Sequence, residues 1–88
     1  MNIEKRVALV TGASRGIGEA TALMLSKRGH KVVLSSRSEE SLIKVQSKIE
    51  SLGGNADYLV CDNSDRAQVE DLIKNCVDKH KRLDILVN

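Results

Sequence analysis

The 88 residues allow one small domain, whose apolar residues are almost all aliphatic, with one tyrosine and no tryptophan, phenylalanine or proline. Lysine and arginine outnumber aspartate and glutamate by only 14 to 12 and are spread along the chain, which argues against a nucleic-acid partner. No apolar run approaches the roughly 18 residues that a membrane span needs, so we expect no membrane partner.

The first half of the chain predicts two strands with one helix between them. Residues 6–11 (RVALVT) form a short β-branched run that is typical of a buried strand. From Gly16 onward apolar residues recur at helical spacing, and Gly29 is placed to end this helix. Residues 31–35 (KVVLS) then predict a second buried strand.

The second half predicts two more helices and two more strands. Ser38 is a candidate N-cap for a helix that Gly53 ends. Residues 56–61 predict a third strand. Asp65 and Gln68 form a capping-box-like pair that is placed to start a third helix, and residues 83–87 predict a fourth strand.

Strands and helices therefore alternate in the order βαβαβαβ. This order, with short connections and strands that are apolar on both faces, predicts a parallel sheet covered by helices on both sides. Right-handed crossovers give the strand order 3-2-1-4, the first half of a three-layer Rossmann-type α/β fold. We expect residues 1–88 to form the N-terminal dinucleotide-binding half of such a domain.

The most informative motif is the glycine loop at residues 11–18 (TGASRGIG), which follows a strand and opens a helix. Gly12 permits a sharp turn off the strand, and Gly16 permits close approach of a pyrophosphate to the backbone. Gly18 lets the helix pack against the sheet. The helix N–H groups and dipole favour phosphate there. A tight turn without a ligand would need only one or two glycines.

The loop spacing resembles that of the short-chain dehydrogenase/reductase family, whose signature at this turn is TGxxxGxG. The resemblance covers the whole chain and is strongest to 3-oxoacyl-carrier-protein reductases and carbonyl reductases. It implies that Asp62 contacts adenine and that Asn63 contributes backbone contacts, although the family commonly has a hydrophobic residue at that position. The terminal LVN, ending at Asn88, resembles the start of the family's NNAG motif.

The end of the second strand indicates which dinucleotide is bound. An NAD site would place an acidic residue there to bind the ribose hydroxyls, but Ser36 and Arg37 occupy these positions. Arg37 can bind a 2′-phosphate through a charge-assisted fork. The resemblance implies that Arg15 contacts the same phosphate, so we predict NADP(H). The predicted cofactor-binding residues are Gly12, Ser14, Arg15, Gly16, Ile17, Gly18, Ser36, Arg37, Asp62, Asn63 and Asn88.

No catalytic residue is predicted within the chain. The family uses a YxxxK pair with an upstream Ser, but the only tyrosine, Tyr58, lies in a predicted strand and is followed four residues later by Asp62. His30 and His80 fit solvated helix ends, where a cation suits the dipole. Cys61 and Cys76 lack metal-ligand spacing, so we predict two reduced thiols and no metal.

Three functional hypotheses follow. The first is a partial NADP(H)-dependent oxidoreductase whose full-length form reduces a ketone or 3-oxoacyl carbonyl, or oxidises the alcohol, and is a homo-oligomer. The 88 residues alone would be inactive. The second is a non-catalytic nucleotide-binding module or an inactive remnant. The third, a methyltransferase-like half-fold, is disfavoured because Arg37 stands where an acidic residue would bind its cofactor's ribose. Without a signal peptide or membrane span, we expect a cytoplasmic location.

Overall fold

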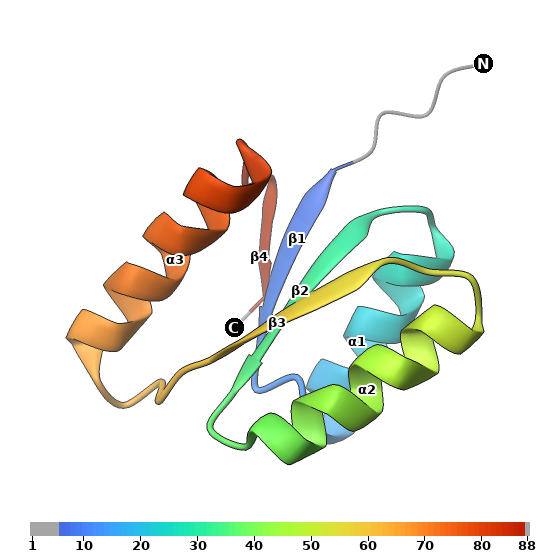
Figure 1. Ribbon diagram of the computed structural model, residues 1–88, viewed down its shortest axis with the longest axis horizontal. Helices are drawn as coiled ribbons and strands as arrows, with labels where there is room; N and C mark the ends of the chain where they lie inside the picture. Colours follow the sequence, from blue (N-terminus) through green and yellow to red (C-terminus); the bar gives the residue numbers. More distant parts are fainter. Residues whose placement is uncertain (1–5, 88) are drawn as a thin grey trace.

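The computed structural model describes residues 6–87, which form strands and helices in alternation (Figure 1). The elements are β1 (Val7–Thr11), α1 (Gly16–Lys27), β2 (Lys31–Ser36), α2 (Glu39–Ser51), β3 (Ala56–Val60), α3 (Arg66–His80) and β4 (Ile85–Val87). The predicted element order is confirmed, with strand ends that differ from prediction by one or two residues.

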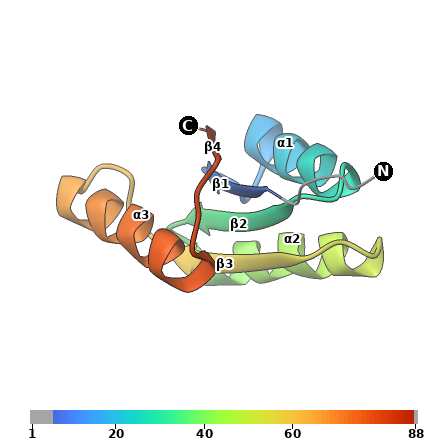
Figure 2. The same ribbon diagram turned by 90° about the horizontal axis from the view of Figure 1, so that it is seen from above.

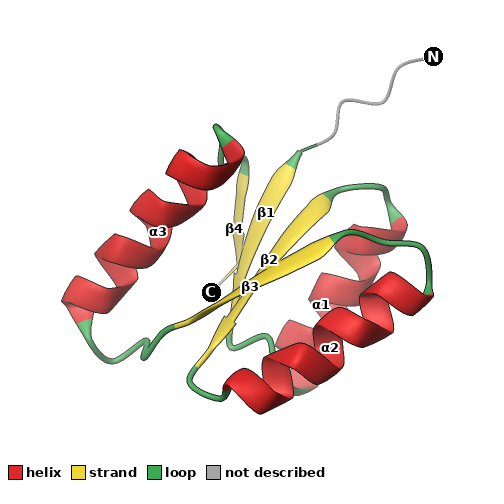
Figure 3. Ribbon diagram, viewed as in Figure 1, coloured by secondary structure: helices red, strands yellow, loops and turns green. Residues whose placement is uncertain are grey.

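The strands form one parallel sheet in the order β3-β2-β1-β4, as predicted (Figure 3). Val10 of β1 lies opposite Leu34 of β2, and Leu34 lies opposite Tyr58 of β3. On the other side of β1, Leu9 lies opposite Leu86 of β4. Because all strands run in the same direction, their carboxyl ends meet at one edge of the sheet, where ligands of such folds bind.

The helices form a layer on each face of the sheet. Figure 1 shows α1 and α2 on one side of the strands and α3 on the other, and the turned view of Figure 2 again shows α3 apart from α1 and α2. Neighbouring residues of a strand point to opposite faces, so β2 contributes to two cores. Leu34 packs with residues of α1 and α2, including Ala22 and Leu42, whereas Val33 packs with Leu72 of α3. The predicted three-layer arrangement is therefore present.

Side-chain caps begin two of the helices. The Ser38 hydroxyl accepts a hydrogen bond from the backbone N–H of Ser41 at the start of α2. The Asp65 carboxylate accepts hydrogen bonds from the N–H groups of Ala67 and Gln68 at the start of α3. Each cap satisfies donors that the first helical turn leaves unpaired.

The helices end at residues with positive φ. Gly29 follows α1 with φ +89°, and Gly53 follows α2 with φ +85°, as predicted for left-handed helix ends. α3 ends instead at Lys81, a non-glycine residue with φ +67°, whose N–H donates to the carbonyl of Val77 at 2.8 Å. The helix end near His80 was predicted, but its left-handed conformation at Lys81 was not, because lysine seldom adopts that conformation.

β4 starts at Ile85 rather than Leu83, and the preceding Asp84 binds β1 both through its backbone N–H, which donates to the Val7 carbonyl at 2.9 Å, and through its side chain. Its carboxylate accepts a hydrogen bond from the N–H of Val7 at 2.9 Å and forms a fork with Arg82, with two N–O distances of 2.7 Å. This arrangement secures the start of β4 beside β1. Within residues 6–87, no helix has the length and apolar character needed to cross a bilayer.

Candidate functional site

The glycine loop turns the chain from β1 into α1 at the carboxyl edge of the sheet. Gly12 and Gly16 have φ values of +61° and +62°, in the left-handed region that favours glycine. Between them, the backbone N–H of Ala13 donates to the carbonyl of Ser35 in β2 at 3.0 Å. This hydrogen bond holds the loop against the second strand.

Gly16 and Gly18 fulfil different steric requirements. A β-carbon at Gly16 would have no atom within 4 Å, so the space beside its backbone is open. A β-carbon at Gly18 would overlap the carbonyl oxygen of Gly12 and come within 3.2 Å of the Ala13 Cα. Gly18 therefore permits α1 to pack closely against the preceding loop, and not against the sheet itself as predicted.

The N-terminus of α1 has no side-chain cap. Arg15 occupies the N-cap position with an extended backbone (φ −163°, ψ 168°), and its side chain makes no capping hydrogen bond. Among the described residues, none accepts a hydrogen bond from the backbone N–H of Gly16, Ile17 or Gly18. These donors and the positive end of the helix dipole form a suitable site for an anion.

An open hollow with a volume of about 680 Å³ lies beside this helix end. It is bounded by the segments that follow β1, β2 and β3, which converge at the carboxyl edge of the sheet (Figure 1). The lining residues are Gly12, Ser14, Arg15, Ser36, Arg37, Ser38, Ser41, Cys61, Asp62, Asn63 and Ser64.

Two guanidinium groups from different elements line the hollow. Arg15 belongs to the glycine loop, and Arg37 follows β2. Both residues are exposed, and neither has an ion-pair partner among residues 6–87. The hydroxyl of Ser36, the last residue of β2, exchanges hydrogen bonds with the backbone of Ser38 at 3.3 and 3.4 Å. This part of the hollow can therefore receive a dianion.

Asp62 is the acidic residue of the hollow. The hydroxyl and backbone N–H of Ser64 donate to its Oδ1 at 2.7 and 2.9 Å, and these bonds, with the nearby charge of Arg37, hold its pKa below the ordinary value. It is therefore an ionised hydrogen-bond acceptor at neutral pH. The adjacent Cys61 is buried, and burial raises the pKa of its thiol, so it is not a reactive thiolate.

The hollow brings together most of the predicted cofactor-binding residues. Gly16, Ile17 and Gly18 do not line it but form the adjoining first turn of α1, and Asn88 lies outside the described residues. Ser38, Ser41, Cys61 and Ser64 line the hollow but were not predicted to do so. Ser38 was predicted only as a helix cap, and an Asp-x-Ser sequence at residues 62–64 was the available signal for Ser64.

The other candidate acid–base groups lie elsewhere. Tyr58 packs on the α2 side of the sheet and donates from its hydroxyl to Glu39 at 3.3 Å. Desolvation and the Glu39 carboxylate raise its pKa, which opposes acid–base use near neutral pH. The described residues include no group of three or more His, Cys, Asp or Glu side chains suited to hold a metal ion.

The histidines depart from the expectation of solvated helix ends. The His80 side chain is only 12% exposed, and its Nε2 lies 3.3 Å from the Asp57 carboxylate on β3. His30 has a buried Nδ1 without a hydrogen-bond partner in the described structure. Neither residue belongs to the hollow. The sequence could not reveal this burial because it depends on packing against elements distant along the chain.

Comparison with known sequences gives a consistent family. The model of the short chain dehydrogenase family matches residues 6–88. A 3-oxoacyl-(acyl-carrier-protein) reductase of Thermotoga maritima is 38% identical over the whole chain, which covers 36% of that enzyme. A short-chain dehydrogenase/reductase homolog of Bacillus subtilis is 39% identical, and this chain covers 82% of it. The chain thus spans about a third of the first relative and most of the second.

Solved structures of the same kind are similar in fold. A metagenomic short-chain oxidoreductase in complex with NADP has a TM-score of 0.89 and 41% identity, covering 92% of this chain and 37% of its own. An actinorhodin polyketide ketoreductase with NADPH has a TM-score of 0.90 and 37% identity, and the match covers 96% of this chain and 32% of the ketoreductase. A 3-oxoacyl-(acyl-carrier-protein) reductase of Agrobacterium tumefaciens with NADP bound has a TM-score of 0.84 and 41% identity, and the match covers 92% of this chain and 31% of the reductase.

Proposed function

This chain belongs to the short chain dehydrogenase family, and from that relationship we propose that residues 1–88 form a dinucleotide-binding half-domain that binds NADP(H) in the hollow. The observation that carries the proposal is the meeting of three features at one place. An uncapped helix N-terminus, two guanidinium groups without ion-pair partners and an ionised aspartate surround the same open volume.

The glycine loop suits a pyrophosphate. The N–H groups of Gly16, Ile17 and Gly18 have no acceptor among the described residues, and the absence of a β-carbon at Gly16 leaves room for close approach. A phosphate bound there would accept hydrogen bonds from backbone donors and lie at the positive end of the α1 dipole. We assign Gly12 and Ser14, which line the hollow beside this turn, to the same subsite.

Arg15 and Arg37 favour NADP(H) over NAD(H). Both line the hollow, and Ser36 at the end of β2 brings no negative charge that would repel a 2′-phosphate. A guanidinium–phosphate contact is a charge-assisted hydrogen bond, worth about 1.5–3 kcal/mol. The similar oxidoreductases with NADP or NADPH bound support the same preference.

Asp62 and Asn63 are assigned to the adenine. The Asp62 carboxylate is an acceptor for an exocyclic amine, and the backbone N–H of Asn63 has no acceptor among the described residues. An acceptor next to a donor complements the adenine edge that carries the amine and N1. Asn88 lies outside the described structure, and its assignment to cofactor binding is a proposal based on resemblance.

The wider activity that we propose is reduction of a ketone or 3-oxoacyl carbonyl, or oxidation of the corresponding alcohol. When bound, NADP(H) supplies or accepts the hydride. The relatives named 3-oxoacyl-(acyl-carrier-protein) reductase support this carbonyl class. In this chain the residues of the hollow bind and orient the dinucleotide. We propose that the catalytic Ser, Tyr and Lys implied by the family, the carbonyl substrate and a homo-oligomeric assembly belong to a full-length form.

A non-catalytic nucleotide-binding module is the second candidate. The observation that favours it is the position of Tyr58, which lies within β3 and is bonded to Glu39 rather than facing the hollow. This function requires the same nucleotide binding but no hydride transfer. A spectrophotometric assay of NADPH oxidation by the full-length form, with 3-oxoacyl and simple ketone substrates, distinguishes the two, because only the oxidoreductase consumes NADPH.

Calorimetric titration with NADPH and NADH tests the proposed cofactor. We expect the chain to bind NADPH about 10- to 100-fold more tightly than NADH. Arg37→Asp should abolish this preference, whereas Arg28→Asp changes the net charge equally at the far end of α1 and should preserve it. If Arg37→Asp retains the NADPH preference of the unaltered chain, the assignment of Arg37 is wrong.

A further inference from the structure

We propose that Ser64 and Gln68 are positioning residues that set Asp62 so that the hollow accepts a 6-aminopurine and rejects a 6-oxopurine. This inference rests on the nucleotide binding proposed above. It extends the recognition of the base to the first turn of α3, an element whose own backbone lies outside the lining of the hollow. Two hydrogen-bonded arms reach Asp62, one at its carboxylate and one at its backbone N–H.

Ser64 forms the first arm and binds one oxygen of the carboxylate. Its hydroxyl donates to Asp62 Oδ1 at 2.7 Å, and its backbone N–H donates to the same oxygen at 2.9 Å. Within the part of the chain that the structure describes, Asp62 Oδ2 has no hydrogen-bond donor. The two bonds therefore fix the plane of the carboxylate and leave its second oxygen available to a ligand.

Gln68 forms the second arm and binds the backbone of Asp62. Its Oε1 accepts a hydrogen bond from the Asp62 N–H at 2.9 Å, and its Nε2 donates to Asp65 Oδ2 at 3.3 Å. The other oxygen of Asp65 caps α3. Gln68 thus has each end of its amide assigned to a different partner, and this fixes the direction in which the amide points.

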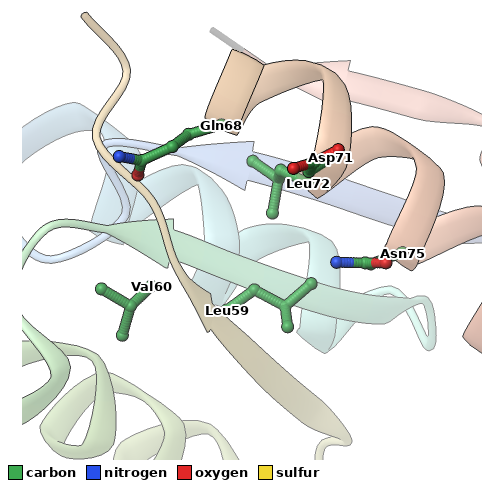
Figure 4. Close-up of a pocket in the computed structure, with 6 residues that line it drawn as sticks. All are labelled: Leu59, Val60, Gln68, Asp71, Leu72 and Asn75. Carbon is green, nitrogen blue, oxygen red and sulfur yellow. The ribbon is translucent and has the colours of Figure 1, made fainter. Parts of the chain in front are cut away.

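Figure 4 shows how Gln68 bridges two elements. Its side chain extends from α3 towards the segment that follows β3, beside a small groove of about 220 Å³ that is also lined by Leu59, Val60 and Leu72. Leu72 of α3 and Leu59 of β3 belong to one apolar cluster that places α3 near β3, and the amide transfers that placement to the backbone at Asp62. Gln68 therefore has no direct contact with the hollow but determines how Asp62 enters it.

The resulting pattern of free groups discriminates between purines. Asp62 Oδ2 is an acceptor, and the Asn63 N–H is a donor without an acceptor in the described structure. Adenine offers a 6-amino donor and the N1 acceptor, which match this pair. A 6-oxopurine offers a carbonyl acceptor and an N1–H donor, so acceptor would face acceptor and donor would face donor. The discrimination requires that Asp62 Oδ2 and the Asn63 N–H both keep a fixed orientation towards the base.

Titrations with adenosine 2′,5′-bisphosphate and inosine 2′,5′-bisphosphate test this inference. The two probes carry the same phosphates and differ at the base. Binding to the 88-residue chain is followed by calorimetry and by amide chemical shifts. We expect the unaltered chain to prefer the adenosine probe by at least about tenfold. Ser64→Ala and Gln68→Met should reduce this ratio to below about threefold, chiefly by weakening the adenosine probe.

Two matched variants separate positioning from a loss of stability. Ser64→Thr keeps the hydroxyl and should restore the ratio. Gln46 lies on α2 and donates to the carbonyl of Ala56 at 2.9 Å, so Gln46→Met removes a comparable amide hydrogen bond away from Asp62 and should leave the ratio unchanged. Ratios in Ser64→Ala and Gln68→Met that equal the unaltered one would overturn the inference alone. If neither probe binds the unaltered chain, the proposed nucleotide site is overturned as well.

Discussion

Gly18 lies so close to the carbonyl of Gly12 that a β-carbon at Gly18 would overlap the Gly12 oxygen. The contact joins the first turn of α1 to the turn that leaves β1. It sets how near the helix N-terminus comes to the loop. The distance between these two glycines is therefore a determinant of the shape of the proposed pyrophosphate subsite.

Gly18→Ala should destabilise the fold. Alanine is favoured over glycine within a helix by about 1 kcal/mol, but the added methyl group meets rigid backbone and should cost about 1–3 kcal/mol. Urea denaturation followed by circular dichroism measures the net change. Ala20→Gly, an exposed position in the same helix, is expected to lose only the propensity term. A Gly18→Ala chain more stable than the original would contradict the proposed close contact.

Gly16→Ala should weaken nucleotide binding more than it weakens the fold. The backbone there has φ +62°, so alanine should cost about 1–2 kcal/mol in stability, and its methyl group would occupy space open to the phosphate. Gly53→Ala is the control, because Gly53 also has positive φ and an open surrounding but lies at the end of α2. Calorimetry with NADPH should show weaker binding for Gly16→Ala only. Equal weakening by both variants would indicate a general effect of strain.

The stability of the chain should decrease as the pH falls below 6.5 because of His80. Burial lowers the pKa of this imidazole below its ordinary value of 6.5, against the opposing effect of the Asp57 carboxylate, while Lys31 and Lys79 lower it further. The unfolded chain therefore binds the proton more readily, and the stabilisation present above pH 6.5 is lost as the pH falls through the pKa of the folded state. Urea midpoints between pH 7.5 and 5 measure this effect.

His80→Gln should reduce the loss of stability below pH 6.5. The matched variant His30→Gln keeps His80, so it should still show the loss that His80 causes. The glutamine preserves a polar side chain near Asp57 but does not titrate. An unchanged dependence in His80→Gln would show that another group causes the loss of stability. Direct measurement of the His80 pKa by proton chemical shifts provides a second test, with a value below 6.5 expected.

Protonation of Asp84 should contribute to acid unfolding, at a lower pH than the protonation of His80. The Arg82 fork and the N–H of Val7 hold the pKa of Asp84 at about 2, compared with an ordinary value of 3.8. Its contribution is present above pH 3.8 and is lost as the pH falls towards about 2, because protonation then favours the unfolded chain. Asp84→Asn keeps an acceptor for Val7 but should flatten this part of the stability curve. Acid titrations of both chains, followed by circular dichroism, provide the comparison.

Features that depend on local residue types were predictable from the sequence. The glycine spacing located the turn between β1 and α1, and the caps at Ser38 and Asp65 located the starts of α2 and α3. The alternation of apolar segments also predicted the parallel order of the sheet. Each of these features follows from backbone conformation, hydrogen-bonding capacity or burial within a short segment.

Features that depend on distant segments were not predictable in the same way. The largely buried His80 lies beside Asp57 on β3, and the left-handed end of α3 falls on Lys81 rather than on a glycine. Gln68 appeared in the sequence only as a partner for the Asp65 cap. Its additional hydrogen bond to Asp62 requires the path of the chain after β3 and the placement of α3 against the sheet.

The hydrogen bond from Ala13 to Ser35 uses only backbone atoms, so it does not constrain which side chains occupy the following positions 36 and 37. The loop that we assign to the pyrophosphate is thereby joined to the strand whose end we assign to the 2′-phosphate. Substitutions at those two positions can change the preferred coenzyme while the loop keeps its support. The fold thus offers a modular route for the evolution or engineering of coenzyme preference through few sequence changes.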